Sequence, residues 1–182
     1  MAIANFPRLL NEKVRNEAGA NSRGLTGVDH VGIPCRDALR TGEFVERILG
    51  GVEMCRVAFD ADARAQGRLP HIFYHVGSQL VEVAEVNDPA ILAQLDAATG
   101  QPHWAFGTTP QGLIDFMKHL DAEDVPYVGP VLHPGSTSVS AYFRDPDGNM
   151  LEVTTWQESP LLDHAELITS AKPPIWQRLK SS

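Results

Sequence analysis

Apolar and polar residues alternate along the first half of the chain in the period-two pattern of β-strands. The pattern covers four segments, which are residues 28–34, 52–59, 71–76 and 79–86. Between the first two, the apolar residues of 44–49 fall on one side of a helix, which Gly50 and Gly51 end. Residues 60–70 are mostly polar and predict a loop. The predicted order is therefore β-α-β-β-β.

The second half of the chain repeats this order. Strand patterns cover residues 103–106, 127–131, 139–144 and 150–156. Apolar residues recur at i, i+3, i+4 and i+7 from Leu113, which predicts a helix between the first two. A linker helix is expected over 87–98, with Asp88 as its N-cap. The sequence thus predicts an α+β protein made of two tandem βαβββ modules, 26–86 and 99–156.

Two further segments flank these modules. Residues 1–25 predict an N-terminal arm that contains a short helix. Residues 157–182 form a C-terminal extension, in which one short helical pattern over 161–168 precedes Pro173 and Pro174. We expect this extension to pack on the modules or on another subunit.

Short motifs repeat at matching places in the two modules. Residues 26–33 and 99–106 both read Thr-Gly-x-x-His, which places His30 and His103 near the start of each module. Residues 79–85 (QLVEVAE) and 149–155 (NMLEVTT) place one glutamate near each end. This agreement indicates an internal duplication, with Glu82 and Glu152 at equivalent positions.

The duplication predicts a metal site. If the modules pack around a pseudo-twofold axis as a U-shaped mixed sheet with helices outside, His30, Glu82, His103 and Glu152 converge in one cavity. Imidazoles and carboxylates suit Fe²⁺, Mn²⁺, Ni²⁺, Co²⁺ or Zn²⁺ and leave positions for substrate. Taken one at a time, such residues are more often satisfied polar groups on the wet face of a strand.

Composition limits the possible partners. The chain has 182 residues, of which 43% are hydrophobic, enough for one domain of ordinary size. Its net charge of −8 disfavours nucleic acid and anionic membranes, which leaves a small-molecule substrate or a protein partner. There is neither a long apolar run nor a signal-peptide core, so we expect a cytoplasmic protein. Cys35 and Cys55 are expected to be packed thiols.

Residues 26–156 resemble the vicinal oxygen chelate superfamily, which includes glyoxalases, bleomycin and fosfomycin resistance proteins, epimerases and extradiol dioxygenases. The resemblance lies in three motifs: VDHVGI at 28–33, PHWAF at 102–106, and YFRDPDGNMLEV at 142–153. It implies that His30, His103 and Glu152 are metal ligands. It also implies the fold predicted above, but it does not identify the reaction.

Two catalytic readings follow from the resemblance. In glyoxalase-like and epimerase-like members a fourth ligand lies where Glu82 stands, and the enzyme acts as a lyase or isomerase by metal-stabilised proton transfer, with Glu82 or Glu152 as base. In ring-cleaving dioxygenases, which use Fe²⁺, a tyrosine ten residues before the final glutamate assists. Tyr142 has that spacing, and His133 matches a histidine of some such enzymes.

Each reading has a counter-argument. Residues 79–86 contain no histidine, although ring-cleaving enzymes usually place their acid/base there. Tyr142 also fits a core aromatic of the last hairpin, and His133 an exposed loop residue. A third possibility is a metal-free drug-binding protein. We favour the lyase or isomerase reading. We also expect a homodimer, with the site completed either within one chain or across the two chains of the dimer.

Overall fold

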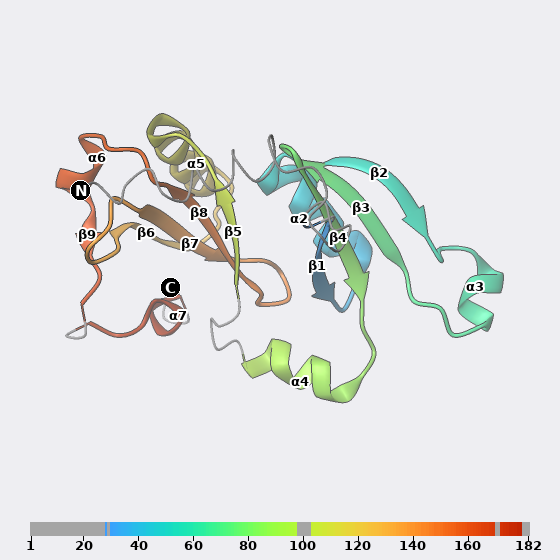
Figure 1. Cartoon of the computed structure of the whole chain (residues 1–182). Coiled ribbons are helices and arrows are strands. Elements are labelled where there is room, and N and C mark those ends of the chain that lie inside the picture. The colour runs from blue at the N-terminus through green and yellow to red at the C-terminus, as the bar shows by residue number, and fades with distance from the viewer. Residues whose placement is uncertain (1–27, 29, 98–102, 170–171, 180–182) are drawn as a thin grey trace, which may run out of the picture. The chain divides into compact units, whose positions relative to one another are not determined.

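The computed structural model describes residue 28 and residues 30–97, 103–169 and 172–179. The chain divides into two compact units (Figure 1). One contains Val28–Gln101 and Arg144–Met150, and the other contains Pro102–Phe143 and Leu151–Ser182. The predicted N-terminal arm, 1–25, lies outside the described residues.

The first module has the predicted βαβββ order, with one short helix added between its second and third strands. Its elements are β1 (His30–Cys35), α2 (Ala38–Leu49), β2 (Val52–Val57), α3 (Ala61–Ala65), β3 (His71–Val76) and β4 (Gln79–Glu85), followed by the linker helix α4 (Pro89–Ala97). The strands form a sheet in the order β1-β4-β3-β2. The sheet is mixed, because β1 pairs with β4 in parallel and the other pairs are antiparallel.

Helix α2 covers one face of this sheet. Asp37 caps it by accepting from the backbone N–H groups of Leu39 and Arg40, and Gly50 ends it in the left-handed conformation at φ 66°. Its buried face packs on side chains of β1, β3 and β4, among them Val83. Since side chains alternate along a strand, Glu82 is placed on the opposite face of β4.

The second module repeats the arrangement of the first. Its elements are β5 (His103–Gly107), α5 (Pro110–Ala122), β6 (Tyr127–Leu132), β7 (Val139–Arg144) and β8 (Met150–Thr155). These strands follow the order β5-β8-β7-β6, which is the order of their equivalents in the first sheet. Leu113 and Leu120 of α5 are fully buried, and Phe116 packs on Phe143 of β7 at a ring-centroid distance of 5.5 Å. The predicted duplication and α+β class are therefore confirmed.

The C-terminal extension differs from the prediction of a single helix. It contains α6 (Leu161–His164), β9 (Glu166–Leu167) and α7 (Ile175–Arg178). The helical pattern stops at His164 because Glu166 and Leu167 pair in parallel with β6 and add a fifth strand to the second sheet. A free sheet edge offers backbone partners that no helical periodicity reveals.

Two local predictions were also wrong. The loop expected over 60–70 contains α3, which Asp60 caps by accepting from Ala63 N–H at 2.8 Å. Three alanines in five residues favour that helix. Cys35 is buried as expected, but Cys55 is exposed because β2 is an edge strand.

The turn between β7 and β8 is tied to the first module by polar contacts. Asp145 accepts from the backbone N–H groups of Asp147 and Asn149, and its burial raises its pKa to about 6. The Asn149 side chain donates to the Pro34 carbonyl at 2.9 Å. Asp147, which is 6% exposed, accepts from Thr41 and Arg36. The Asp-Pro-Asp-Gly-Asn motif is thus a structural clamp.

None of the helices in the described part of the chain has the length and apolar content needed to cross a bilayer.

The clamp predicts that substitutions of two aspartates differ strongly in their effect on the stability of the protein. Asp147→Ala removes the acceptor of the buried Thr41 hydroxyl and of the exposed Arg36 guanidinium, so the free energy of unfolding is expected to fall by about 2 kcal/mol. Asp115→Ala, a control on the surface of α5, is expected to change it by less than about 0.5 kcal/mol. Urea denaturation measures both. Equal effects of the two substitutions would show that the clamp contributes nothing.

Candidate metal and catalytic site

His30 and Glu82 lie together on the face of the first sheet opposite to α2. The two strands that carry them are parallel neighbours, with Glu82 in register with Gly32. The Glu82 carboxylate lies over this glycine, since a Cβ there would be 3.5 Å from Oε2. The same oxygen is 3.5 Å from His30 Nε2. An imidazole nitrogen and a carboxylate oxygen therefore meet in this module as the duplication predicts.

His71 binds the other oxygen of Glu82. Its Nδ1 is 2.6 Å from Glu82 Oε1, and since an ionised carboxylate only accepts, Nδ1 carries the proton. His71 reaches Glu82 from β3, where the next residue on the same face, Phe73, pairs with Glu82 and makes an edge contact with His30. Glu82 is thus held between two histidines, and its side chain is 18% exposed.

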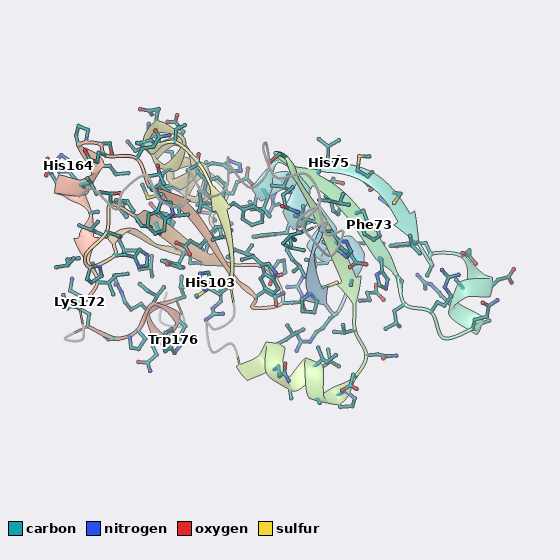
Figure 2. The ribbon with its side chains drawn as sticks, viewed as in Figure 1. Phe73, His75, His103, His164, Lys172 and Trp176 are labelled. Atoms are coloured by element: carbon teal, nitrogen blue, oxygen red, sulfur yellow. The ribbon has the colours of Figure 1, made fainter. Side chains whose placement is uncertain are left out.

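His75 lies further along the same face of β3. Figure 2 labels it together with Phe73. His75 pairs with Leu80 rather than with Glu82, and it is exposed. It therefore offers a matched comparison with His71, because the two differ in whether they contact Glu82.

His103 and Glu152 form the equivalent pair in the second module. His103 opens β5 (Figure 2), and its Nε2 is 2.8 Å from Oε2 of Glu152 on the neighbouring strand β8. Glu152 is only 6% exposed. A buried carboxylate needs partners for both oxygens, and the hydroxyl of Ser140 on β7 donates to Oε1 at 2.5 Å. This pair is therefore drier and more firmly held than that of His30 and Glu82.

Tyr142 and His133 lie beside Glu152. The Tyr142 hydroxyl is 3.0 Å from His133 Nε2, and this nitrogen is 4.0 Å from Glu152 Oε1. Burial raises the pKa of Tyr142, with a further contribution from the charge of Glu152, while burial lowers the pKa of His133. A protonated phenol therefore donates to a neutral imidazole. Tyr142 is buried in the last hairpin and is also hydrogen-bonded at the site, so its two predicted roles are compatible.

The structure thus brings the predicted ligands together in two pairs, one in each unit. Among the residues described, no group of three or more His, Cys, Asp or Glu side chains is arranged to hold a metal ion. The donor set nevertheless fits a divalent metal, because each pair presents an imidazole nitrogen beside a carboxylate oxygen. That the four residues act together stays a prediction.

Sequence reasoning missed two contributors, His71 and Ser140. The contact of His71 with Glu82 depends on the register of β3 against β4, which no pattern along the chain reveals. Ser140 had one signal, since Ser138, just before β7, and Ser140, within it, alternate with the buried Val139 and Ala141. Only the pairing of strands shows that this polar side of β7 faces Glu152.

Comparison with known proteins identifies the fold. A model of the Glyoxalase/Bleomycin resistance protein/Dioxygenase superfamily matches residues 27–153. No curated protein sequence matches the chain. The fosfomycin resistance protein FosX from Listeria monocytogenes aligns with a TM-score of 0.58 and 16% identity, over 71% of this chain and 92% of that chain. Another crystal of that protein contains Mn(II) with sulfate, and a crystal of a point mutant of it contains Mn(II) with 1S,2S-dihydroxypropylphosphonic acid.

Two further solved structures have the same fold. FosX from Mesorhizobium loti aligns with a TM-score of 0.52 and 19% identity, over 71% of this chain and 90% of that chain. An integron cassette protein from the mobile metagenome of the Halifax Harbour sewage outfall aligns with a TM-score of 0.55 and 22% identity, over 72% and 99% of the two chains.

The contact between His71 and Glu82 predicts unequal effects of two histidine substitutions on the binding of Co²⁺. His71→Ala removes the 2.6 Å hydrogen bond that orients Glu82, so the affinity for Co²⁺ is expected to fall about 10-fold or more. His75→Ala, four residues along the same strand face, is expected to leave the affinity unchanged. Titration followed by the visible Co²⁺ absorption spectrum measures both, and equal losses would contradict the prediction.

Proposed function

The chain belongs to the glyoxalase/bleomycin resistance protein/dioxygenase superfamily, and on this basis we propose that it is a divalent-metal-dependent lyase or isomerase. It acts by proton transfer on a small oxygenated organic substrate. The observation that carries the proposal is the repeated His–Glu pair, His30 with Glu82 and His103 with Glu152.

The four residues of these pairs would hold the metal. Two imidazoles and two carboxylates suit Mn²⁺, Fe²⁺, Co²⁺, Ni²⁺ and Zn²⁺. The presence of Mn(II) in crystals of the Listeria protein of the same fold supports a divalent ion without fixing which. When bound, such an ion polarises a substrate oxygen and stabilises negative charge that develops on it.

Glu82 is the better candidate for the base that moves the proton. Both oxygens of Glu152 have protein partners, His103 and Ser140, and its side chain is almost fully buried. The Glu82 carboxylate is more accessible, with Oε2 3.5 Å from His30 and Oε1 held by His71. A base must reach the proton that it removes, and a fixed carboxylate with one less constrained oxygen meets this need. His71 would hold Glu82 in orientation while the proton moves.

A second candidate function is an Fe²⁺ extradiol dioxygenase that acts on a catechol-type substrate. It is supported by the hydrogen bond between Tyr142 and His133 beside Glu152, since a phenol and a neutral imidazole can position a catechol oxygen. The metal-free binding protein is less well supported, because such a protein has no need of two matched His–Glu pairs. The homodimer and the cytoplasmic location stay predictions.

Metal analysis of the purified protein and two variants tests the first proposal. The native protein is expected to retain a divalent metal, and Glu82→Ala and Glu152→Ala are each expected to lower the affinity by more than about 100-fold, beyond the effect of losing an outer partner. Glu46→Ala, an exposed glutamate on α2, is the control and is expected to bind as the native protein does. Elemental analysis after dialysis against a weak chelator gives the result.

The same experiment separates the two catalytic readings. One possible result is that the native protein binds iron, that Glu152→Ala loses it and that Glu82→Ala retains it. In that case Glu82 is not a ligand, and the lyase or isomerase proposal fails in favour of the dioxygenase. If neither variant differs from Glu46→Ala in metal content, the four residues do not form a metal site.

Oxygen consumption tests the dioxygenase directly. If that function holds, the ferrous protein consumes O₂ with a catechol and forms a yellow ring-fission product. Tyr142→Phe is then expected to lower kcat by about 10²-fold or more, because it removes only the hydroxyl that contacts His133. Our first proposal instead expects no oxygen uptake across a panel of substituted catechols. Uptake that depends on Tyr142 would overturn it.

A further inference from the structure

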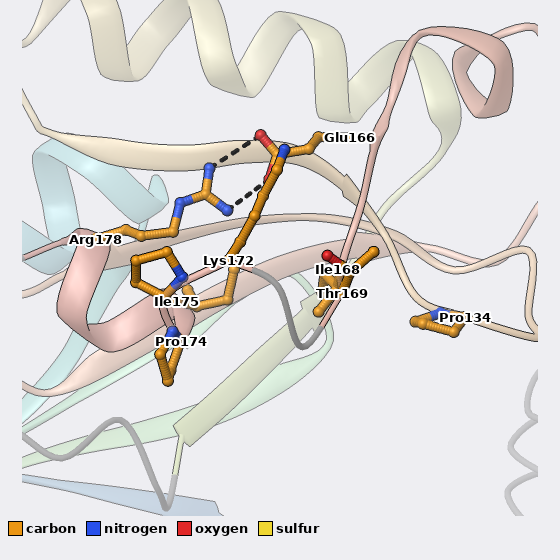
Figure 3. Close-up of a pocket in the computed structure, with 9 residues that line it drawn as sticks. Pro134, Glu166, Ile168, Thr169, Lys172, Pro174, Ile175 and Arg178 are labelled. Carbon is orange, nitrogen blue, oxygen red and sulfur yellow. Dashed lines mark hydrogen bonds and ion pairs between the residues drawn. The ribbon is translucent and has the colours of Figure 1, made fainter.

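A cavity lies in the unit that contains the C-terminal extension, and most of its lining comes from beyond the region matched by the superfamily model. The match ends at residue 153. The cavity has a volume of about 420 Å³, within the range of small-ligand pockets. Nine residues line it (Figure 3): Pro134, Glu166, Ile168, Thr169, Lys172, Pro173, Pro174, Ile175 and Arg178. None of them belongs to the metal and catalytic site described above.

The polar part of the cavity carries an excess of positive charge. Arg178 donates to both oxygens of Glu166, at 2.7 and 3.1 Å, and Lys172 Nζ is 3.1 Å from Oε1 (Figure 3). Hydrogen bonds from these two cations lower the pKa of Glu166, so its carboxylate is ionised. Two cations around one carboxylate leave a net charge of +1, although the whole chain has a net charge of −8.

The surplus cation is not needed to hold the extension in place. A single bidentate pair between Arg178 and Glu166 already links α7 to β9. Strand β9 is also attached to β6 by its own pairing, and Ile168 N–H donates to the Leu132 carbonyl at 3.0 Å. The Lys172 side chain is 50% exposed, and its ammonium group has N–H donors beyond the one that Glu166 accepts.

The remaining wall of the cavity is apolar and stiff. Pro134, Pro173 and Pro174 have fixed ring geometry, and Ile168 and Ile175 complete the apolar lining. Such a wall loses little conformational freedom when it covers a ligand, so binding there costs little entropy. An apolar wall beside a surplus cation suits a molecule with an apolar body and a single negative charge.

We propose that this cavity binds a small organic carboxylate with an apolar body, such as an aryl- or branched alkyl-carboxylate. The carboxylate lies against Lys172 and the N–H groups of Arg178 that Glu166 leaves available. The body lies against the prolines and Ile175. The cavity would then be a second small-molecule site, chemically distinct from the histidine- and glutamate-rich site.

Phenylacetate is the probe that tests this proposal, with benzyl alcohol and acetate as partial probes. Benzyl alcohol keeps an aromatic body without the charge, and acetate keeps the charge without the body. Amide chemical shifts of the full-length ¹⁵N-labelled protein are expected to move saturably with phenylacetate at Ile168, Thr169 and Lys172. Both partial probes are expected to bind about tenfold more weakly or worse, since each loses one of the two interactions.

Lys172→Gln and Lys118→Gln form a matched pair of variants. Each removes one positive charge, but Lys118 lies on the surface of α5 and pairs with Asp115. Lys172→Gln is expected to weaken phenylacetate binding about tenfold and Lys118→Gln to leave it unchanged. Thermal melting checks that both variants fold. Ile175→Asn tests the apolar wall independently and is also expected to weaken phenylacetate binding.

Three results would overturn the proposal. They are the absence of saturable binding, equal affinities in the two lysine variants, and shifts confined to residues around His103 and Glu152. The last result would place the probe in the proposed catalytic site instead.

Discussion

The chemistry proposed for Glu82 depends on the alternation of side chains along β4, the last strand of the first module. Val81 and Val83 are fully buried, and Val83 belongs to the core beneath α2. Burial of two such side chains is worth roughly 3–6 kcal/mol in total. A shift of register by one residue would expose both valines and turn Glu82 into the apolar core. The hydrophobic effect therefore fixes the direction of the carboxylate that we propose as ligand and base.

Side chains also alternate along the equivalent strand of the second module, β8, which is more deeply buried than β4. Strand β8 is buried along its whole length, so Glu152 must satisfy its charge within the protein. His103 and Ser140 provide this, and a hydroxyl pair of Ser138 and Thr154 extends the polar side of the hairpin. A duplicated sequence has thus produced two unequal sites. One carboxylate is held by a histidine and a serine and is nearly dry, and the other is held between two histidines and is more open.

The motif most characteristic of the superfamily acts through structure. Residues 145–149 place no side chain on the His–Glu pairs. Asp147 instead binds Arg36 and Thr41, and Asn149 binds the Pro34 carbonyl at the end of β1. The turn therefore fixes the end of β1 and the start of α2, while the strands on either side of the turn carry Tyr142 and Glu152. Its strong sequence signal identifies the fold and is silent about the reaction, because the clamp is independent of the substrate.

The sequence by itself determined the α+β class, the two modules, most element boundaries and the four His and Glu positions. These features are local or periodic: amphipathic spacing, the cap Asp88, and the repeated motifs. Tertiary structure decided the contact of His71 with Glu82, the position of Ser140 beneath Glu152, the addition of β9 to the sheet edge and the cavity between α7 and residue 134. Each of these depends on which strands pair and in what register. That choice is made by side chains far apart in the chain packing together, so no pattern within a short window contains it.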